Sequence, residues 1–325
     1  MGNVMLHLYR GLQVALVIPC FNEAVAIRQV VTDFKNAMPE LRIYVFDNNS
    51  TDGTRQVAEE AGAWVYSVKL KGKGNVVRRM FADIDADIYV MVDGDATYEA
   101  KAVTKLVDRL IDERLDMVVG SRKATQSSEG AAYRPGHEFG NWMLTSCVKR
   151  IFGGEFGDML SGYRAFSRRY AKSFPALSRG FETETELTVH ALELRMPYAE
   201  IETLYGARPE GSTSKLSTYR DGLRILWTIA KLFIRERPFQ FFGLLSLLLA
   251  ATSIGLSVPV LEEFIAHGIV PRLPTAVLSA SMMVCALLAL VSGLILDNVT
   301  RGRHEIKRLT YLSIPAAEDK TTISS

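Results

Sequence analysis

The sequence predicts an α/β fold with a mostly parallel, doubly wound sheet, followed by an amphipathic helix and a two-helix transmembrane hairpin. Three observations lead to this prediction. Short β-rich runs alternate with helical patterns through the first 120 residues, polar clusters follow the ends of those runs, and two long uncharged segments lie near the C-terminus. Alternating strands and helices are typical of parallel sheets with crossover helices, and long uncharged segments are typical of membrane spans.

The expected elements follow one another in a regular order. The strand candidates are apolar runs rich in β-branched and aromatic residues: Val14–Ile18, Ile43–Phe46, Trp64–Ser67, Ile88–Val92 and Met117–Val119. The helical patterns between them cover Ala24–Met38, Thr54–Ala61, Asn75–Ile84 and Lys101–Glu113. Beyond residue 120, we expect a second half packed on the same sheet, with helices near Phe139–Phe152 and Glu182–Leu194.

Composition narrows the class of protein. The 325 residues carry a net charge of +2, so the global basic field of nucleic-acid-binding proteins is absent. The three cysteines are Cys20, Cys147 and Cys285, and their spacing indicates neither a zinc site nor a disulfide framework. A reducing cytoplasm suits the α/β part.

Phe239–Val260 and Thr275–Leu296 are each 22 residues long and free of charge, which is enough to cross a bilayer. The alternative, a pair of buried core helices, suits them less because polar residues are sparse. Basic residues flank the pair on both outer sides: Lys231, Arg235 and Arg237 before it, and Arg301, Arg303, Lys307 and Arg308 after it. The positive-inside rule therefore predicts that both ends face the cytoplasm.

Tyr219–Arg237 has the pattern of an amphipathic helix. Its basic residues share one face and its apolar residues another; the basic ones are Arg220, Arg224, Lys231 and Arg235. This pattern favours a helix lying on anionic headgroups, and the alternative is a surface helix packed on the α/β domain.

Asp93 and Asp95 follow the predicted strand Ile88–Val92. Two carboxylates at this edge of an open α/β sheet suit a divalent cation that carries a diphosphate. The alternative is a turn and helix cap. Gly72-Lys73-Gly74 lacks the third glycine of a dinucleotide fingerprint, so a metal and basic side chains are the expected phosphate ligands.

Asp47–Gly53 follows the second predicted strand and is rich in short polar side chains. These side chains can cap the next helix or hydrogen-bond a base or ribose. Proximity to Asp93 and Asp95 makes the segment a candidate nucleotide site.

Taken together, the motifs resemble those of the family 2 glycosyltransferases with a GT-A fold. They are, in order, Ile18-Pro19-Cys20-Phe21-Asn22-Glu23, Asp47 to Gly53, Gly72-Lys73-Gly74, Asp93-Gly94-Asp95, Gly120-Ser121-Arg122, Asp158-Met159-Leu160-Ser161-Gly162-Tyr163-Arg164 and Arg208 to Lys215. The last two resemble motifs of the polyprenyl-phosphate sugar synthases, including bacterial bactoprenol glucosyltransferases and dolichol-phosphate mannose synthases. Two positions depart from the dolichol-phosphate mannose synthases: Thr97 stands where they have glutamine, and Asn48 where they have aspartate.

The resemblance implies an enzyme that transfers a sugar with inversion from a nucleotide diphosphate sugar to polyprenyl (undecaprenyl) phosphate. UDP-glucose or a UDP-N-acetylhexosamine is the expected donor, and GDP-mannose is the alternative. Mg²⁺ or Mn²⁺ is the expected cofactor, held by Asp93 and Asp95. The implied donor-binding residues are Pro19, Asn22, Glu23, Asp47, Asn49, Asp52, Lys73 and Asp93.

The acceptor phosphate calls for fixed cations, and arginine suits phosphate because its fork can bind two oxygens. The candidates are Arg122, Arg134, Arg208 and Lys215, with a surface salt bridge as the alternative for Arg134. Asp158 is expected to act beside Asp95 as a base or an orienting group, or else to have a structural role. Arg164 is expected to brace the fold. Glu184 and Glu186 are expected to face solvent, with the positioning of substrate as the alternative.

The predicted organisation is a cytoplasmic GT-A domain at 1–216, a juxtamembrane helix at 217–238, a hairpin at 239–296 and a cytoplasmic tail at 297–325. The resemblance implies a bacterial cytoplasmic membrane and association of copies through the hairpins, with no nucleic-acid partner. A processive polysaccharide synthase is disfavoured because Q-x-x-R-W does not occur. A non-catalytic membrane scaffold would leave the ordered phosphate motifs unexplained.

Overall fold

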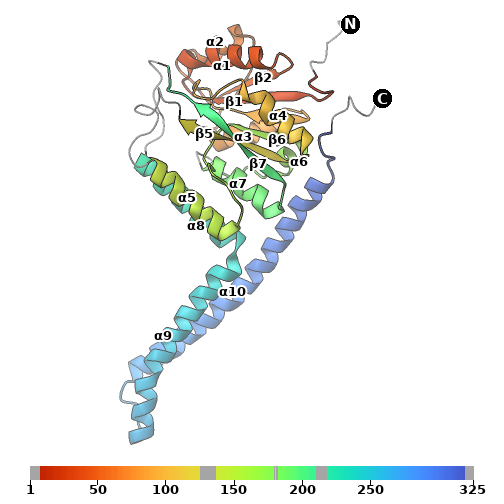
Figure 1. Ribbon diagram of the computed structural model, residues 1–325. Helices are drawn as coiled ribbons and strands as arrows, with labels where there is room; N and C mark the ends of the chain where they lie inside the picture. The colour runs from red at the N-terminus through yellow and green to blue at the C-terminus, as the bar shows by residue number, and fades with distance from the viewer. Residues whose placement is uncertain (1–7, 125–136, 179, 181, 210–217, 319–325) are drawn as a thin grey trace. The chain divides into compact units, whose positions relative to one another are not determined.

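The computed structural model describes residues 8–124, 137–178, 180, 182–209 and 218–318 (Figure 1). The chain divides into two compact units. The α/β unit contains residues 1–227 together with 307–325, and the hairpin unit contains residues 228–306. Arg134 and Lys215 lie outside the described residues, so their predicted roles stay predictions.

Seven strands of the α/β unit form one mixed, mostly parallel sheet in the order β3-β2-β1-β4-β6-β5-β7. The strands are β1 (Val14–Cys20), β2 (Arg42–Asp47), β3 (Trp64–Ser67), β4 (Ile88–Met91), β5 (Met117–Ala124), β6 (Arg164–Ser167) and β7 (Tyr198–Tyr205). Only β6 runs antiparallel to its neighbours, β4 and β5, among the described pairings. The GT-A-type, Rossmann-like fold class is therefore confirmed.

Helices connect these strands in the expected alternation. They are α1 (Ala24–Ala37), α2 (Thr54–Glu60), α3 (Lys73–Asp83), α4 (Ala102–Asp112), α5 (His137–Phe152), α6 (Arg168–Ser173) and α7 (Thr183–Leu194). The five expected strands and six expected helices are confirmed, whereas β6, β7 and α6 were not predicted. β6 has only four residues and begins with an arginine, and β7 carries two glutamates, so neither reads as an apolar run.

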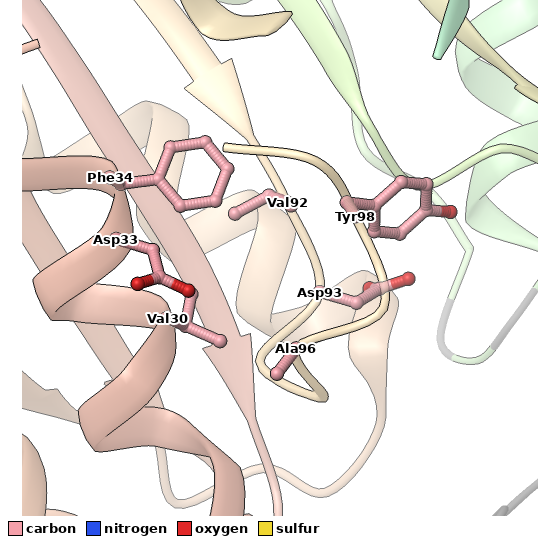
Figure 2. Close-up of a pocket in the computed structure, with 7 residues that line it drawn as sticks. All are labelled: Val30, Asp33, Phe34, Val92, Asp93, Ala96 and Tyr98. Atoms are coloured by element: carbon pink, nitrogen blue, oxygen red, sulfur yellow. The ribbon is translucent and has the colours of Figure 1, made fainter. Parts of the chain in front are cut away.

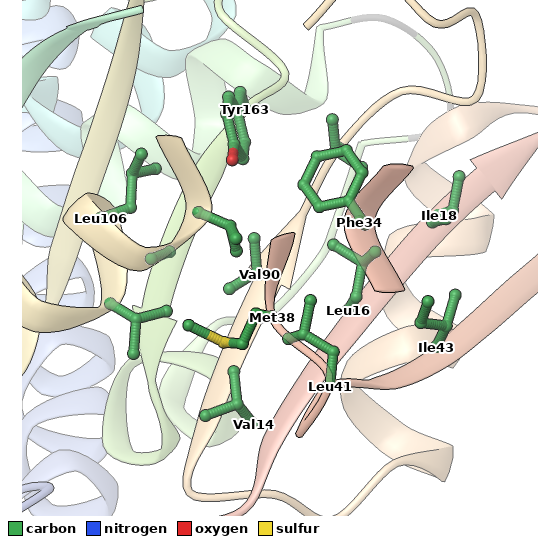
Figure 3. Packing of buried hydrophobic residues seen from close by; sticks show 14 of the residues in the cluster. Val14, Leu16, Ile18, Phe34, Met38, Leu41, Ile43, Val90, Leu106 and Tyr163 are labelled. Atoms are coloured by element: carbon green, nitrogen blue, oxygen red, sulfur yellow. The ribbon is translucent and has the colours of Figure 1, made fainter. Parts of the chain in front are cut away.

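The core lies on both faces of the sheet, which explains why the central strands are apolar at nearly every position. On one face, Leu16 of β1 packs with Phe34 of α1 and Leu106 of α4 in a single buried cluster (Figure 3). On the other face, the ring of Phe81 lies edge-on to both Tyr89 and Phe166.

The C-terminal helices are α8 (Thr218–Glu236), α9 (Pro238–His267) and α10 (Leu273–Leu312). α9 and α10 are long and apolar enough to span a membrane, and only 11% and 17% of their most apolar windows are buried. Within the hairpin unit, the Ser253 hydroxyl donates to the Ser279 carbonyl oxygen at 2.6 Å. α9 ends at His267 and is capped by Gly268, whose φ of +69° suits the left-handed cap of a helix.

The end of α10 returns to the α/β unit and is fastened there. The Tyr311 hydroxyl donates to Asp116 Oδ2 at 2.8 Å, and the Arg169 guanidinium lies over the Tyr311 ring. Lys307 pairs with Glu193 at 3.0 Å. Asp116 is fully buried at the start of β5 and also accepts from Arg169 and Ser167. The residues after the second apolar segment are thus partly built into the α/β unit.

Candidate active site

Parallel strands β1, β2 and β4 end at one edge of the sheet and bring their following loops together. β1 pairs with β2 up to Cys20 and Asp47, and with β4 up to Val17 and Met91. Asp93 and Asp95 come directly after β4, at the edge where open α/β sheets bind ligands. Both carboxylates lie where the sequence predicted them.

Lys73 links the first aspartate to the second half of the chain. Its ammonium nitrogen lies 2.5 Å from Asp93 Oδ1 and 2.5 Å from Glu184 Oε1. Burial lowers the pKa of Lys73, but Asp93 and Glu184 together raise that pKa above the ordinary lysine value. The lysine is therefore a fixed cation, placed by the start of α3 beside the aspartate.

Asp95 has its own cation. Arg208 Nη2 lies 2.7 Å from Asp95 Oδ2, and the Thr97 hydroxyl donates to Asp95 Oδ1 at 2.6 Å. Burial and the neighbouring Asp93 carboxylate raise the pKa of Asp95, although Arg208 and Thr97 act in the opposite direction. Thr97 thus orients the aspartate.

A close backbone approach joins these aspartates to the loop that follows α5. A Cβ on Gly162 would lie 2.4 Å from Asp93 Oδ2, so only glycine fits there without displacement. The Gly162 amide donates to the Tyr98 hydroxyl at 3.0 Å. The loop from Asp158 to Gly162 is therefore part of the same site.

Arg122 and Asp158 form a two-pronged pair in that part of the site. Arg122 Nε lies 2.6 Å from Asp158 Oδ2, and Arg122 Nη2 lies 2.8 Å from Oδ1. Burial lowers the pKa of Arg122, but Asp158 raises it well above the ordinary value. The Arg122 guanidinium also lies over the Tyr205 ring, and Glu200 accepts hydrogen bonds from the Gly157 and Asp158 amides.

The loops after β1 and β2 are joined by hydrogen bonds. The Thr51 amide donates to Asn22 Oδ1 at 2.8 Å, and the Glu23 amide donates to the Thr54 hydroxyl at 2.8 Å. Burial raises the pKa of Asp52, but hydrogen bonds from Thr54 and the Ala24 amide lower it overall. The loops after β1 and β2 therefore form one polar surface, which we call the polar shelf; it includes Asn22, Glu23 and Asp52. The shelf lies beside the end of β1, where Pro19 is the second-last residue of the strand.

The same shelf is tied to the loop that carries Lys73. Asn48 donates to the Val68 and Leu70 carbonyl oxygens and accepts from the Gly72 amide at 2.7 Å. Asn49 has a φ of +64° and also donates to Val68. Asp47 is buried and accepts from the Ser50 amide. These bonds stabilise turns and join loops, whereas α2, the helix that follows the segment, has no side-chain cap at its N-cap residue Gly53.

A small pocket lies on the α1 side of the aspartate loop (Figure 2). Its lining consists of Val30, Asp33, Phe34, Val92, Asp93, Ala96 and Tyr98. Figure 2 shows Asp33 on one wall and Asp93 on the other. Its lining contains neither Lys73 nor an arginine, so we place the phosphate-binding candidates outside it.

One expectation about the second half is wrong. Glu184 and Glu186 are buried in α7 and do not face solvent. Glu186 accepts from the Leu177 and Ser178 amides, and Glu184 binds Lys73. Charged side chains suggested an exposed helix, but this helix carries no lysine or arginine and is buried on nearly every side.

Sequence reasoning missed several site residues. Tyr98, Glu200 and Tyr205 carry no motif that would have singled them out. Glu184 was considered as a substrate-positioning residue, but a solvent-facing position was favoured for it. Arg164, expected to brace the fold, does so: it is fully buried and donates to the Ser161 carbonyl oxygen at 2.9 Å.

The site has the chemistry of a hard-cation and phosphate centre. Asp93 and Asp95 offer carboxylate oxygens, which Mg²⁺ and Mn²⁺ prefer, and a bound cation would offset the burial and the carboxylate repulsion that raise the pKa of Asp95. Glu184 Oε2 is buried and has no hydrogen-bond partner among the described residues. The donor set therefore fits a divalent cation.

Comparisons with known proteins agree with this geometry. Residues 15–174 match the model of the family described as glycosyl transferase family 2. The glycosyltransferase AglJ of Haloferax volcanii is 34% identical over 301 residues, covering 92% of this chain and 98% of the relative. The dodecaprenyl-phosphate galacturonate synthase of Rhizobium johnstonii is 24% identical, covering 90% and 89%.

A solved structure shares the fold. The glucosyl-3-phosphoglycerate synthase of Mycobacterium tuberculosis, in complex with Mn²⁺, UDP-glucose and phosphoglyceric acid, aligns with a TM-score of 0.56 at 22% identity. The alignment covers 69% of this chain and 80% of that chain. From the fold, the family match and a relative matched over nearly its whole length, we conclude that this chain belongs to glycosyltransferase family 2 and is a glycosyltransferase.

Proposed function

We propose that this enzyme transfers a sugar, with inversion, from a nucleotide diphosphate sugar to a polyprenyl phosphate. The observation that carries the proposal is the site itself: two adjacent aspartates, each paired with a fixed cation, beside a second arginine–carboxylate pair. Such a centre can bring two phosphate groups together against their mutual repulsion.

On the donor side, Asp93 and Asp95 would hold Mg²⁺ or Mn²⁺. The ion would neutralise the charge that grows on the diphosphate leaving group as the glycosidic bond breaks. The mycobacterial synthase of similar fold, which was solved with Mn²⁺ and UDP-glucose, supports this choice and a UDP-sugar as donor.

Lys73 would bind the donor diphosphate. Two of its three N–H donors point to Asp93 and Glu184, which leaves one for a phosphate oxygen. The polar shelf formed by the loops after β1 and β2 would bind the nucleoside; its proposed contacts are Pro19, Asn22, Glu23, Asp47, Asn49 and Asp52.

On the acceptor side, Arg122 and Arg208 would bind the lipid phosphate, with Arg134 and Lys215 as further candidates. A phosphate monoester is already anionic at neutral pH, so the reaction does not require a strong general base. We assign Asp158 the role of orienting Arg122, because both of its carboxylate oxygens bind that guanidinium.

Direct attack by the lipid phosphate inverts the anomeric carbon, so an α-linked donor gives a β-linked lipid-phosphate sugar. The two apolar helices would keep the enzyme where the acceptor resides. We propose a bacterial cytoplasmic membrane with the α/β unit in the cytoplasm, from the basic residues that flank the hairpin. The similarity to the dodecaprenyl-phosphate galacturonate synthase of Rhizobium johnstonii supports the acceptor class.

The test is transfer of label into an organic extract. Purified full-length enzyme is incubated with Mg²⁺ or Mn²⁺, undecaprenyl phosphate and a panel of radiolabelled UDP- and GDP-sugars. We expect a UDP-hexose to label the lipid, and Asp95→Asn to reduce the rate about 10³-fold because charge on the leaving group is no longer offset.

Asp33→Asn is the matched control, since this exposed carboxylate lies near the same loop and is expected to be dispensable. Labelling from GDP-mannose alone would replace our donor assignment. Absence of labelled lipid with every donor, or full activity of Asp95→Asn, would refute the proposed reaction.

A further inference from the structure

Arg164 is a buried cation whose position needs an explanation. It lies on β6, opposite Met91 of β4 and Val119 of β5, and its exposed surface is 0%. In the described part of the chain, no carboxylate lies within ion-pair distance of its guanidinium. Burial of such a group is costly unless its donors are satisfied, so its hydrogen bonds determine what it does.

Its oxygen acceptors lie on two separate elements, and Nη1 also donates to Met117 Sδ of β5 at 3.5 Å. Nε donates to the Ser161 carbonyl at 2.9 Å and Nη2 donates to the Met159 carbonyl. Nη1 donates to the Thr188 hydroxyl of α7 at 3.0 Å. The planar fork of arginine can satisfy acceptors in these different directions, whereas a lysine ammonium on a flexible stem does not fix such a geometry.

The first element is the loop that shapes the acceptor side of the site. It begins with Asp158, which binds Arg122, and ends with Gly162, whose backbone approaches Asp93. Arg164 contacts the two carbonyls between these ends. Loss of the clamp would therefore change where Asp158 and Gly162 lie.

The second element is the turn of α7 that carries Glu184. The Thr188 hydroxyl accepts from Arg164 and donates to the Glu184 carbonyl oxygen at 3.1 Å. The Glu184 carboxylate in turn binds Lys73, which binds Asp93. Arg164 is thus connected through Thr188 to the cation on the donor side.

We propose that Arg164, acting with Thr188, is a positioning residue that holds the Asp158–Gly162 loop and the Glu184 turn of α7 in fixed relation. Arg122 and Lys73 then face the two phosphates at the separation that transfer requires. This inference rests on the proposed function for its kinetic consequence, but its structural part can be measured without substrate.

The experiment compares three threonine variants of the full-length enzyme. Thr188→Val keeps the shape but leaves one guanidinium N–H without an acceptor, and Thr188→Ser restores the hydroxyl. Thr185→Val is the matched control, because Thr185 is fully buried on the same helix and its hydroxyl has no hydrogen-bond partner among the described residues.

Amide hydrogen exchange provides the readout that does not depend on activity. For Thr188→Val we expect the amides of Ser161, Gly162 and Tyr163 to exchange about 5-fold faster, because the loop opens locally. Thr188→Ser and Thr185→Val should exchange like the wild type. Equal exchange in Thr188→Val and Thr185→Val would overturn the proposal.

Kinetics separate positioning from general support of the fold. For Thr188→Val we expect kcat to fall about 10-fold with the donor KM changed less than 2-fold, because misalignment affects the reacting geometry more than binding. The proposal would also be overturned if kcat of Thr188→Val fell only in proportion to its folded fraction and Thr188→Ser did not recover the wild-type kcat. Thr188 would then have a merely structural role.

Arg164→Lys is a second variant that keeps the charge and removes the fork. In Arg164→Lys, the amide exchange rate should rise both in the Asp158–Gly162 loop and in the first turn of α7. If only one of these segments responds, Arg164 does not couple them. A wild-type enzyme that labels no lipid would refute the proposed function, while the exchange comparison would still decide the positioning claim.

Discussion

The two halves of the α/β unit build their parts of the site in different ways. In the first half, from β1 to α4, the polar side chains follow parallel strands and bond mainly to neighbouring loops. In the second half, from β5 to β7, the side chains pair over long sequence distances. Arg122 pairs with Asp158, and Glu184 reaches back to Lys73. The first half thus depends on regular topology and the second on individual side-chain pairs.

The largest effect is expected from replacing Lys73, because this lysine connects the two halves of the site through Asp93 and Glu184. Lys73→Met leaves Asp93 and the buried Glu184 without their cation. We expect about 3 kcal/mol lower unfolding free energy, as for a broken buried ion pair, together with at least about 100-fold lower kcat. Urea unfolding and the lipid-labelling assay measure the two effects. Lys71→Met is the control, because Lys71 is exposed and lies two residues away. It should leave the unfolding free energy and kcat nearly unchanged.

The Arg122–Asp158 pair tests whether the second half works through coupled side chains. We expect Arg122→Met and Asp158→Asn each to reduce kcat about 100-fold, and the double variant to lose no more than either alone, because each acts through the other. The double-mutant cycle is measured by initial rates at saturating donor. Additive losses would mean that Asp158 acts independently, as a base.

Gly162→Ala tests the close approach of the second half to Asp93. The added Cβ would meet Asp93 Oδ2 at 2.4 Å, so we expect kcat to fall about 10-fold and stability to fall by about 1–3 kcal/mol through overpacking. Gly206→Ala is the control, since its added Cβ would meet nothing closer than 3.8 Å. Similar effects of the two substitutions would remove the special role of Gly162.

Tyr311→Phe tests a long-range pair away from the site. It leaves the buried Asp116 without one of its hydrogen-bond donors, and we expect about 1–2 kcal/mol lower stability with unchanged kcat. Thermal unfolding of the detergent-solubilised protein measures this. Leu309→Ala, on an exposed position of the same helix, should be nearly neutral.

Asp52→Asn should have the smallest effect, because the first-half shelf shares its support among many bonds. The folded pKa of Asp52 lies below its unfolded value, so its stabilising contribution is present above the unfolded pKa of about 3.9 and is lost as the pH falls through the folded pKa. The difference in Tm between the wild type and Asp52→Asn should therefore shrink on acidification. A difference that grows on acidification would contradict this assignment.

The same contrast explains what the sequence could predict. Strands β1 to β5 were found because their apolar runs end in turn residues, and Asp93 and Asp95 were found because they follow β4. The short β6 was missed, because pairing on both sides fixes it more than its own pattern does. The exposure of Glu184 was misjudged because its partner, Lys73, lies more than 100 residues earlier in the chain. The local sequence around Glu184 does not indicate an ion pair with so distant a residue.

The return of the chain to the α/β unit at residue 307 has a consequence for biosynthesis. Asp116 and Arg169 leave the ribosome long before Tyr311, which lies near the C-terminal end of α10. The fastening at the base of β5 can therefore close only after the hairpin has been translated. The α/β unit is thus completed only after α9 and α10 have been made, so that chains arrested before α10 would expose an incomplete domain to quality control.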